Sequence, residues 1–335
     1  MSKRFWVGCD MAKATFWVSV SDLRQGVQGW TELPAECFEN TSAGIEAFVA
    51  WLSKQGVDAQ SVAGVCLEAT GRLSVRWTKA LDDRLGPVSI VNPALPNAHR
   101  KSLGIRDKTD RVDACVLALF AKATAPAPTV FRSPMRQELC ELYRLRESLN
   151  AQCHANEQRL ADGPTSACVR VTLAKMIKAQ KRQVENVEKQ MDAVIAQDPQ
   201  LRQDARRIES ISGVGRKTAW IILSEFHDLR QYKRNELVAL AGLFPKQTTS
   251  GTSVHKKARL AKGGGGRVRK TLYLCAMSAK VYNPQMRQFA QRLEANGKEP
   301  MEAIGAVMRK LLLVIRAVVV NERDYDPQWV PGCSQ

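Results

Sequence analysis

Two short apolar runs in the N-terminal third of the chain each end at a carboxylate. Residues 5–9 lead into Asp10, and residues 62–67 lead into Glu68. Apolar runs of this length are typical of strands buried in a sheet, because helices need longer segments. A charge at the end of a core strand lies at the rim of the sheet, where ligands bind in open α/β folds. The pattern therefore predicts a buried sheet with acidic side chains at its rim.

The rest of residues 1–123 alternates between strand and helix patterns. Further strands are expected at 15–20, near 36–39 and at 88–91, with residues 11–14 joining the first two strands as a hairpin. Helices are expected at 42–52 and 73–85. The order β-β-β-α-β-α-β-α predicts an α/β domain, residues 1–123, with a mixed sheet and helices on its faces.

A segment rich in proline and alanine, residues 124–129, indicates a domain boundary, and residues 124–134 are interpreted as a linker. Two long helices are expected at 135–161 and 167–197. In the second, a heptad stripe has Gln180 in its one polar position and otherwise consists of Leu173, Ile177, Val184, Val187, Met191 and Val194; in the first, a similar stripe begins with Leu142, Leu145 and Leu149. The stripes predict an antiparallel coiled-coil arm, residues 135–197, that can pair with another subunit; a plain helical spacer is the alternative.

From Asp198 onward the pattern is helical apart from one long loop at residues 245–265, so residues 198–335 are expected to form an all-α domain. A length of 335 residues leaves room for two compact domains and a connecting element. The net charge of +17 favours nucleic acid as partner. Nine cysteines without a C-x-x-C pair, and no apolar segment long enough for a membrane, predict a cytoplasmic protein that does not bind membranes.

Asp110 and Asp113 are three residues apart and therefore project from one face of a helix. Taken singly, each of the four acids is more simply a turn or surface residue. Together with Asp10 and Glu68, however, they would repel one another unless Mg²⁺ or Mn²⁺ neutralised them. Two such ions about 4 Å apart can hold the attacking and leaving oxygens of a phosphodiester. The arrangement resembles the ribonuclease H-like fold, especially RuvC-type resolvases.

Residues 209–219 resemble the turn of a helix-hairpin-helix module. Gly213 and Gly215 would allow a tight turn, so that backbone N–H groups of the next helix, with Lys217 and Thr218, face a phosphate. Such a contact would position nucleic acid without reading its sequence. A structural turn that binds no ligand is the alternative.

Residues 246–270 contain eight basic residues and no acid: Lys246, Lys256, Lys257, Arg259, Lys262, Arg267, Arg269 and Lys270. We expect them to contact nucleic acid. The same loop carries Ser250 and Ser253, and a serine beside such charge and a divalent ion can lose its proton and attack phosphorus. A surface that only binds phosphate is the alternative.

Five motifs, in this order along the chain, resemble those of one family. Gly8-Cys9-Asp10-Met11-Ala12-Lys13 resembles its G-x-D-x-A-K, and Leu67-Glu68-Ala69-Thr70-Gly71 its E-A-T-G. Lys108-Thr109-Asp110-Arg111-Val112-Asp113-Ala114 resembles K-T-D-x-x-D-A. In the second half, the segments beginning at Ile211 and at Ala241, the latter running on to Ser250-Gly251-Thr252-Ser253, resemble its transposase domain. The family is that of the DEDD-type insertion-sequence transposases, bridge-RNA-guided recombinases related to the Piv-type DNA invertases.

The resemblance implies that Asp10, Glu68, Asp110 and Asp113 form a metal-binding tetrad and that Ser250 forms a covalent phosphoserine link to DNA, with Ser253 as its rival. It also implies dimers that assemble into a tetramer, in which one subunit's carboxylates serve another's serine. A structured noncoding RNA would select donor and target DNA, in association with the bacterial nucleoid. No P-loop motif is present, so ATP is not expected.

Two further functions stay open at this point. The first is a RuvC-like nuclease or Holliday-junction resolvase in which water attacks and Ser250 only contacts DNA. The second is a scaffold without activity, which would leave the four acids unexplained. A run of four glycines, residues 263–266, departs from the family pattern and is interpreted as a hinge or, equally, as a helix-start spacer.

Overall fold

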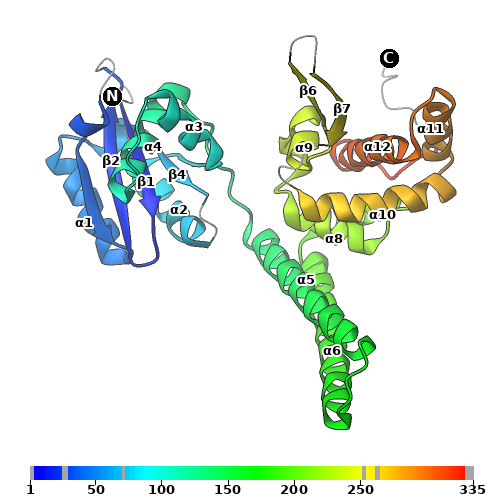
Figure 1. Ribbon diagram of the computed structural model, residues 1–335. Coiled ribbons are helices and arrows are strands. Elements are labelled where there is room, and N and C mark those ends of the chain that lie inside the picture. Colours follow the sequence, from blue (N-terminus) through cyan, green and yellow to red (C-terminus); the bar gives the residue numbers. More distant parts are fainter. Residues whose placement is uncertain (1–3, 25–28, 70–71, 251–253, 261–264, 329–335) are drawn as a thin grey trace. The chain divides into compact units, whose positions relative to one another are not determined.

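The chain, described here by a computed structural model, divides into two compact units, Met1–Phe131 and Arg132–Gln335 (Figure 1). The structure describes residues 4–24, 29–69, 72–250, 254–260 and 265–328. Within these ranges, only the backbone is considered for residues 72–76, 246–250 and 254–259.

The first unit contains a five-stranded mixed sheet of order β3-β2-β1-β4-β5. Its strands are β1 (Phe5–Met11), β2 (Thr15–Asp22), β3 (Ala35–Glu39), β4 (Val62–Glu68) and β5 (Val88–Val91). Its helices are α1 (Ser42–Lys54), α2 (Arg72–Leu85), α3 (Ala94–Ser102) and α4 (Asp110–Thr124). The predicted order of strands and helices is confirmed, and α3 is an addition that the sequence pattern did not predict. The mixed sheet fits the ribonuclease H-like fold class.

Side chains of β1 alternate between the two faces of the sheet. Val7 and Cys9 belong to the core that includes Ile45 and Phe48 of α1. Trp6 belongs to a separate cluster with Leu117 of α4. Because alternate residues of a strand share a face, Asp10 lies on the same face as Trp6, the face that α4 covers.

Gly8 lets α4 approach that face closely. A Cβ at Gly8 would lie 2.3 Å from both Ala114 O and Ala118 N of α4, closer than atoms can pack. Ser21 on β2 adds a buried hydrogen bond, because its hydroxyl donates to Ala118 O at 3.0 Å. The absence of a side chain at Gly8 therefore fixes how near α4 comes to β1.

Part of the predicted linker belongs to the first unit, which corrects the expected boundary at residue 123. The chain after α4 runs along β5, where Thr129 N donates to Val88 O and its hydroxyl accepts from Ile90 N, both at 2.7 Å. The hydroxyl of Ser89 donates to Pro126 O at 2.9 Å. Here the extended chain forms hydrogen bonds with backbone groups of β5, which would otherwise be unpaired at the edge of the sheet.

The second unit begins with two long helices, α5 (Pro134–Ala161) and α6 (Ala167–Gln197), which pack against each other. They are antiparallel, since Arg146 pairs with Glu188 at 2.7 Å and Asn156 with Gln180 at 3.1 Å. Of the α6 stripe, Ile177, Val187, Met191 and Val194 are buried and Leu173 and Val184 are partly buried. Its polar member Gln180 accepts from Asn156 of α5. On α5 the prediction for Leu145 is wrong: this side chain is 48% exposed, while its neighbours Tyr143 and Arg146 are buried.

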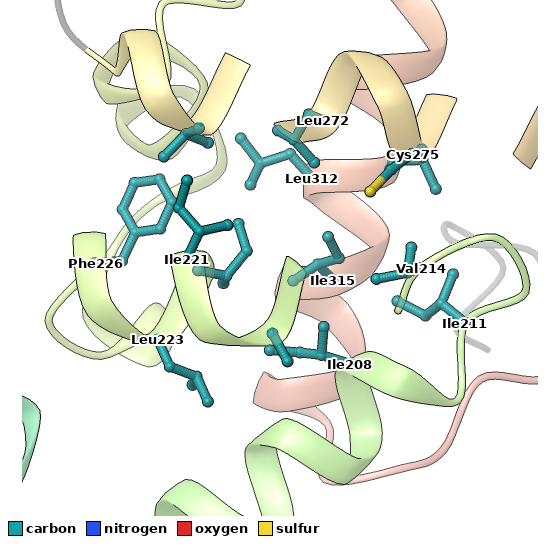
Figure 2. Packing of buried hydrophobic residues seen from close by; sticks show 14 of the residues in the cluster. Ile208, Ile211, Val214, Ile221, Leu223, Phe226, Leu272, Cys275, Leu312 and Ile315 are labelled. Carbon is teal, nitrogen blue, oxygen red and sulfur yellow. The ribbon is translucent and has the colours of Figure 1, made fainter. Parts of the chain in front are cut away.

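The remaining helices enclose one apolar core around α12 (Pro300–Val320). They are α7 (Pro199–Glu209), α8 (Arg216–Glu225), α9 (Arg234–Leu240), α10 (Gly266–Tyr282) and α11 (Pro284–Ala295). Figure 2 shows Ile208 and Ile211 packed near Ile315 of α12, with Leu272 of α10 beside Leu312. No helix within the described residues combines the length and apolar character needed to cross a bilayer.

The prediction of a loop at residues 245–265 is wrong for most of this range. Strands β6 (Pro245–Ser250) and β7 (Val254–Leu260) form an antiparallel hairpin, with Thr249 opposite His255 and Ser250 opposite Val254. Threonine and valine are β-branched and favour extended backbone. The many hydroxyl and basic side chains of this segment are typical of a loop, so the preference for extended backbone was not recognised from the sequence.

Candidate active site

Asp10 and Glu68 come from neighbouring parallel strands. β1 and β4 pair with Cys9 opposite Leu67, so the next residues along the chains, Asp10 and Glu68, are adjacent at the carboxyl ends of the strands. Glu68 is two residues beyond Cys66, which belongs to the cluster that contacts α4. Both carboxylates therefore lie on the face of the sheet that α4 covers.

The first turn of α4 brings the other two acids to the same place. Thr109 caps the helix, its hydroxyl accepting from Val112 N at 3.3 Å, and Asp110 and Asp113 follow in the first turn. Acidic side chains at a helix N-terminus are favoured by the helix dipole. Because Gly8 holds α4 against β1, this turn comes close to Asp10.

All four acids line one cavity of about 490 Å³. The prediction that Asp10, Glu68, Asp110 and Asp113 belong to one site therefore has direct geometric support. Apolar residues of α4, Val116 and Leu117, form part of its wall.

The carboxylates influence one another. Burial, followed by the charges of Asp113, Asp110 and Glu68, raises the pKa of Asp10 to about 6. Burial and the charge of Asp113 also raise the pKa of Glu68, and burial raises that of Asp113. Such shifts are characteristic of functional sites where like charges are held together.

Two basic side chains line the same cavity and were not predicted as site residues. Lys108 lowers the pKa of both Glu68 and Asp113, and Arg100 lowers that of Asp113. Arg100, on α3, donates to Asn97 Oδ1 at 2.9 Å and to Asp107 O at 3.3 Å, which ties α3 to the segment before α4. Lys108 begins the K-T-D-x-x-D-A motif, so the sequence could have identified it as a site residue. Arg100 lies on α3, a helix that the sequence pattern did not predict.

The donor set fits a hard divalent cation, because four carboxylates face one cavity. Among the described residues, however, no three His, Cys, Asp or Glu side chains already lie close enough together to enclose a metal ion.

Ser250 belongs to the second unit, as the last residue of β6, where its backbone is opposite Val254. Its rival Ser253 lies outside the described residues, as do Lys262, Gly263 and Gly264. Lys246 is in β6, and Lys256, Lys257 and Arg259 are in β7, so these predicted nucleic-acid contacts occupy the same hairpin as Ser250.

The basic residues after the hairpin differ in their surroundings. Arg267 donates to Glu225 at 2.7 Å, Arg269 donates to Ala241 O at 3.5 Å, and Lys270 is exposed. Gly265 has φ +42°, and a Cβ there would lie 2.7 Å from Leu240 O. For Gly265 this close packing favours the helix-start interpretation over the hinge.

The predicted helix-hairpin-helix segment joins α7 to α8 by a short turn. Gly213 has φ +91°, and a Cβ there would lie 2.7 Å from Ala279 Cα, so the turn needs glycine to pack against α10; Gly215 caps α8. Lys217 is 70% exposed but lies 3.8 Å from Glu188 of the arm. Thr218 is buried, and its hydroxyl contacts Cys275 Sγ at 2.8 Å, so its side chain faces the core and cannot contact a phosphate.

Comparisons with known proteins agree with this arrangement. A transposase model of the IS110 DEDD type matches residues 7–162, and a model described as the transposase IS116/IS110/IS902 family matches residues 205–291. Together they cover more than two thirds of the chain. The chain belongs to the IS110 family of transposases. The first match contains all four acids of this transposase, and the second contains Ser250 and its hairpin.

Relatives of the transposase include proteins that invert DNA. The pilin gene-inverting proteins of Moraxella bovis and Moraxella lacunata are each 28% identical over 328 residues, which is 97% of this chain and 98% of theirs. An IS110 insertion-element protein of Streptomyces coelicolor is 24% identical over 216 residues, 62% of this chain and 52% of its own. The transposase is thus an enzyme of DNA recombination, and its DEDD-type domain implies dependence on a divalent metal ion.

Proposed function

We propose that this transposase cleaves and rejoins DNA strands through a covalent phosphoserine at Ser250, guided by a structured RNA, with Mg²⁺ held by Asp10, Glu68, Asp110 and Asp113. The observation that carries the proposal is the convergence of these four carboxylates on one cavity. A scaffold protein has no use for four acids that converge on one cavity, because the repulsion between neighbouring carboxylates costs stability.

In this scheme the four carboxylates hold and orient Mg²⁺, which when bound neutralises charge at the phosphodiester and favours the leaving oxygen. Arg100 and Lys108 line the same cavity and offset the acids there. They would attract the DNA backbone, because an acidic cavity without cations would repel a phosphate. The cavity thus offers carboxylates for a metal ion and two cations for a phosphate.

Ser250 is the proposed nucleophile. Its hydroxyl gives up a proton to solvent, Oγ forms an ester bond to phosphorus, the bond from phosphorus to the leaving DNA oxygen breaks, and that oxygen takes up a proton to become a DNA hydroxyl. A DNA hydroxyl then attacks the phosphoserine, and the serine is released. Because the ester conserves the energy of the phosphodiester bond, no ATP is required. The basic residues of β6 and β7 support this role, since they place positive charge on the hairpin that carries Ser250.

The carboxylates and Ser250 belong to different compact units. We propose that oligomers, dimers assembling to a tetramer, complete each active site with acids from one subunit and Ser250 from another. A noncoding RNA from the same element would select donor and target DNA by base pairing, which accords with a protein rich in backbone-binding cations.

The chemistry is tested by incubating the transposase with candidate guide RNA, Mg²⁺ and a nicked suicide DNA, followed by a denaturing gel. We expect a protein–DNA adduct that Ser250→Ala abolishes and Ser253→Ala retains. Asp113→Asn should abolish the adduct while leaving the fold intact. Cleavage without an adduct would instead indicate a nuclease that uses water, and adduct formation by Ser250→Ala would refute the assignment of the nucleophile.

Shared sites are tested by mixing two inactive variants. Asp113→Asn keeps Ser250, and Ser250→Ala keeps the carboxylates, so a mixed oligomer contains intact sites only if acids and serine come from different subunits. We expect adduct formation to return in the mixture, on the Asp113→Asn chain. No recovery, in a mixture shown by tagged pull-down to form mixed oligomers, would mean that each subunit uses its own residues.

A further inference from the structure

Two cations of the second unit share one aromatic ring. Lys310 Nζ lies 4.4 Å from the centroid of the Phe289 ring, and Arg292 Cζ lies 5.5 Å from the same centroid. Phe289 and Arg292 belong to α11, whereas Lys310 comes from α12. Within the described part of the chain, neither cation has a carboxylate as ion-pair partner.

This arrangement costs free energy in the protein alone. Lys310 is half-buried, and burial followed by the charge of Arg292 lowers the pKa of its ammonium group. A cation over an aromatic ring is attracted to the face of the ring, and two like charges near each other oppose that attraction. Two other half-buried cations of this unit have a carboxylate as ion-pair partner: Arg230 lies 2.9 Å from Asp204, and Lys280 lies 2.5 Å from Glu294.

The two cations line a cavity of about 410 Å³ formed by α11, α12 and residues 327–328. Its other polar groups are the amides of Gln285, Gln288 and Gln328. Gln285 is held in place because its Nε2 donates to Pro327 O and its Oε1 accepts from the Tyr325 hydroxyl at 3.2 Å, so Gln288 and Gln328 are the amides that would contact a ligand. Cavities of roughly 300–1,000 Å³ accept small ligands, so this one has room for a phosphate together with its sugar.

We propose that this cavity binds a backbone phosphate of a nucleic-acid strand, which Arg292 and Lys310 neutralise while glutamine amides contact the adjoining sugar. A phosphodiester is the anion that fits, because the chain carries a net charge of +17 and acts on DNA. Amides that donate and accept suit the sugar beside a phosphate better than a bare ion. The contact would position a strand without reading its sequence.

The test uses full-length Arg292→Gln, Lys310→Met and the double variant. Arg309→Gln is the control, because it removes the same charge from the neighbouring position of α12 and lines a different groove. Binding of a single-stranded DNA and of the RNA of the same sequence is followed by fluorescence anisotropy over a salt series. Neutralising one phosphate contributes about 0.7 to the slope of log K against log salt, so the double variant should lose about 0.7 and each single variant part of that.

The two nucleic acids identify the source of the phosphate. A reduced slope with both indicates a backbone contact that either strand can make, and a reduction with only one assigns the site to DNA or to RNA. Any of these supports the proposal, provided that Arg309→Gln changes less. Slopes that equal those of Arg309→Gln with both strands would overturn it.

Thermal unfolding without nucleic acid separates binding from a structural role. Lys310→Met keeps an apolar side chain on Phe289 and removes the like charge, so we expect its Tm to equal or exceed that of the unmodified protein. A lower Tm with an unchanged salt slope would show that Lys310 is a structural cation, and would overturn the proposal. These measurements report binding and stability only, so their failure leaves the phosphoserine chemistry standing, and the converse also holds.

Discussion

Replacing Asp10 by asparagine should stabilise the first unit when divalent ions are removed. Burial and the neighbouring carboxylates raise the pKa of Asp10 from about 3.8 to about 6. Between these values the folded chain binds more protons than the unfolded chain, so stability falls as pH rises through this window and stays low above it. Asparagine has nearly the same shape but no charge, and therefore removes the penalty.

A rise of about two pKa units corresponds to about 3 kcal/mol at roughly 1.36 kcal/mol per unit. The carboxyl group is only partly buried, so solvent screening reduces this to roughly 1.5 kcal/mol at neutral pH. About half of the penalty should be present near pH 5, where Asp10 is ionised in the unfolded chain but mostly protonated in the folded one. For a unit of this size, the full effect raises Tm by about 5 °C.

The assay is scanning calorimetry of the full chain with a chelator, near pH 5 and near pH 7.5. Asp83→Asn, which removes an exposed acid of α2, controls for the change in net charge. We expect Asp10→Asn to raise Tm more at the higher pH, and added Mg²⁺ to stabilise the unmodified protein more than this variant. A lower Tm for Asp10→Asn at both pH values would show that Asp10 supports the core, and would refute the electrostatic reasoning.

Three further outcomes follow from particular contacts. Gly8→Ala should cost about 3 kcal/mol and abolish DNA cleavage, because its Cβ would lie 2.3 Å from the backbone of α4; chemical denaturation and the adduct gel measure the two effects. Asp204→Asn should cost about 3–5 kcal/mol in denaturant, since this buried carboxylate accepts from three arginines and a neutral amide no longer balances their charge. Lys108→Gln should move the acidic limb of the pH–activity profile towards higher pH, because Lys108 lowers the pKa of Glu68, whereas exposed Lys101→Gln should leave the profile unchanged.

The convergence of the four acids could be predicted because the position of each acid follows from the residue pattern of its own strand or helix. A strand that alternates in burial determines on which face Asp10 lies, and helix periodicity places Asp110 and Asp113 together. What the sequence did not reveal was α3, since Pro93 and Pro96 suggest a loop. Proline is tolerated in the first turn of a helix, where N–H groups have no partner. Missing α3 meant missing Arg100, a cavity residue.

Two other errors arose where tertiary contacts decide between local alternatives. Leu145 fits a heptad stripe as well as its neighbours do, yet Tyr143 and Arg146 take the buried positions on α5. Arg146 does so because Glu188 accepts from it and the ring of Trp220 lies 5.7 Å away, contacts that come from α6 and α8. The segment with Ser250 forms a hairpin because β6 and β7 pair with each other in register. The residue pattern of either strand alone does not show that this partner exists.

The four carboxylates differ in how far the protein itself stabilises their charge. Lys108 lowers the pKa of Glu68 and Asp113, and Arg100 also lowers that of Asp113. For Asp10, only a backbone hydrogen bond opposes burial and the three neighbouring acids, and its pKa is raised to about 6. The ionised form of Asp10 is thus strongly disfavoured in the chain alone, so a bound cation should change its protonation strongly. Because protons and cation compete for this carboxylate, metal affinity should fall steeply as pH drops below about 6 in the unmodified protein, and less steeply in Asp10→Asn.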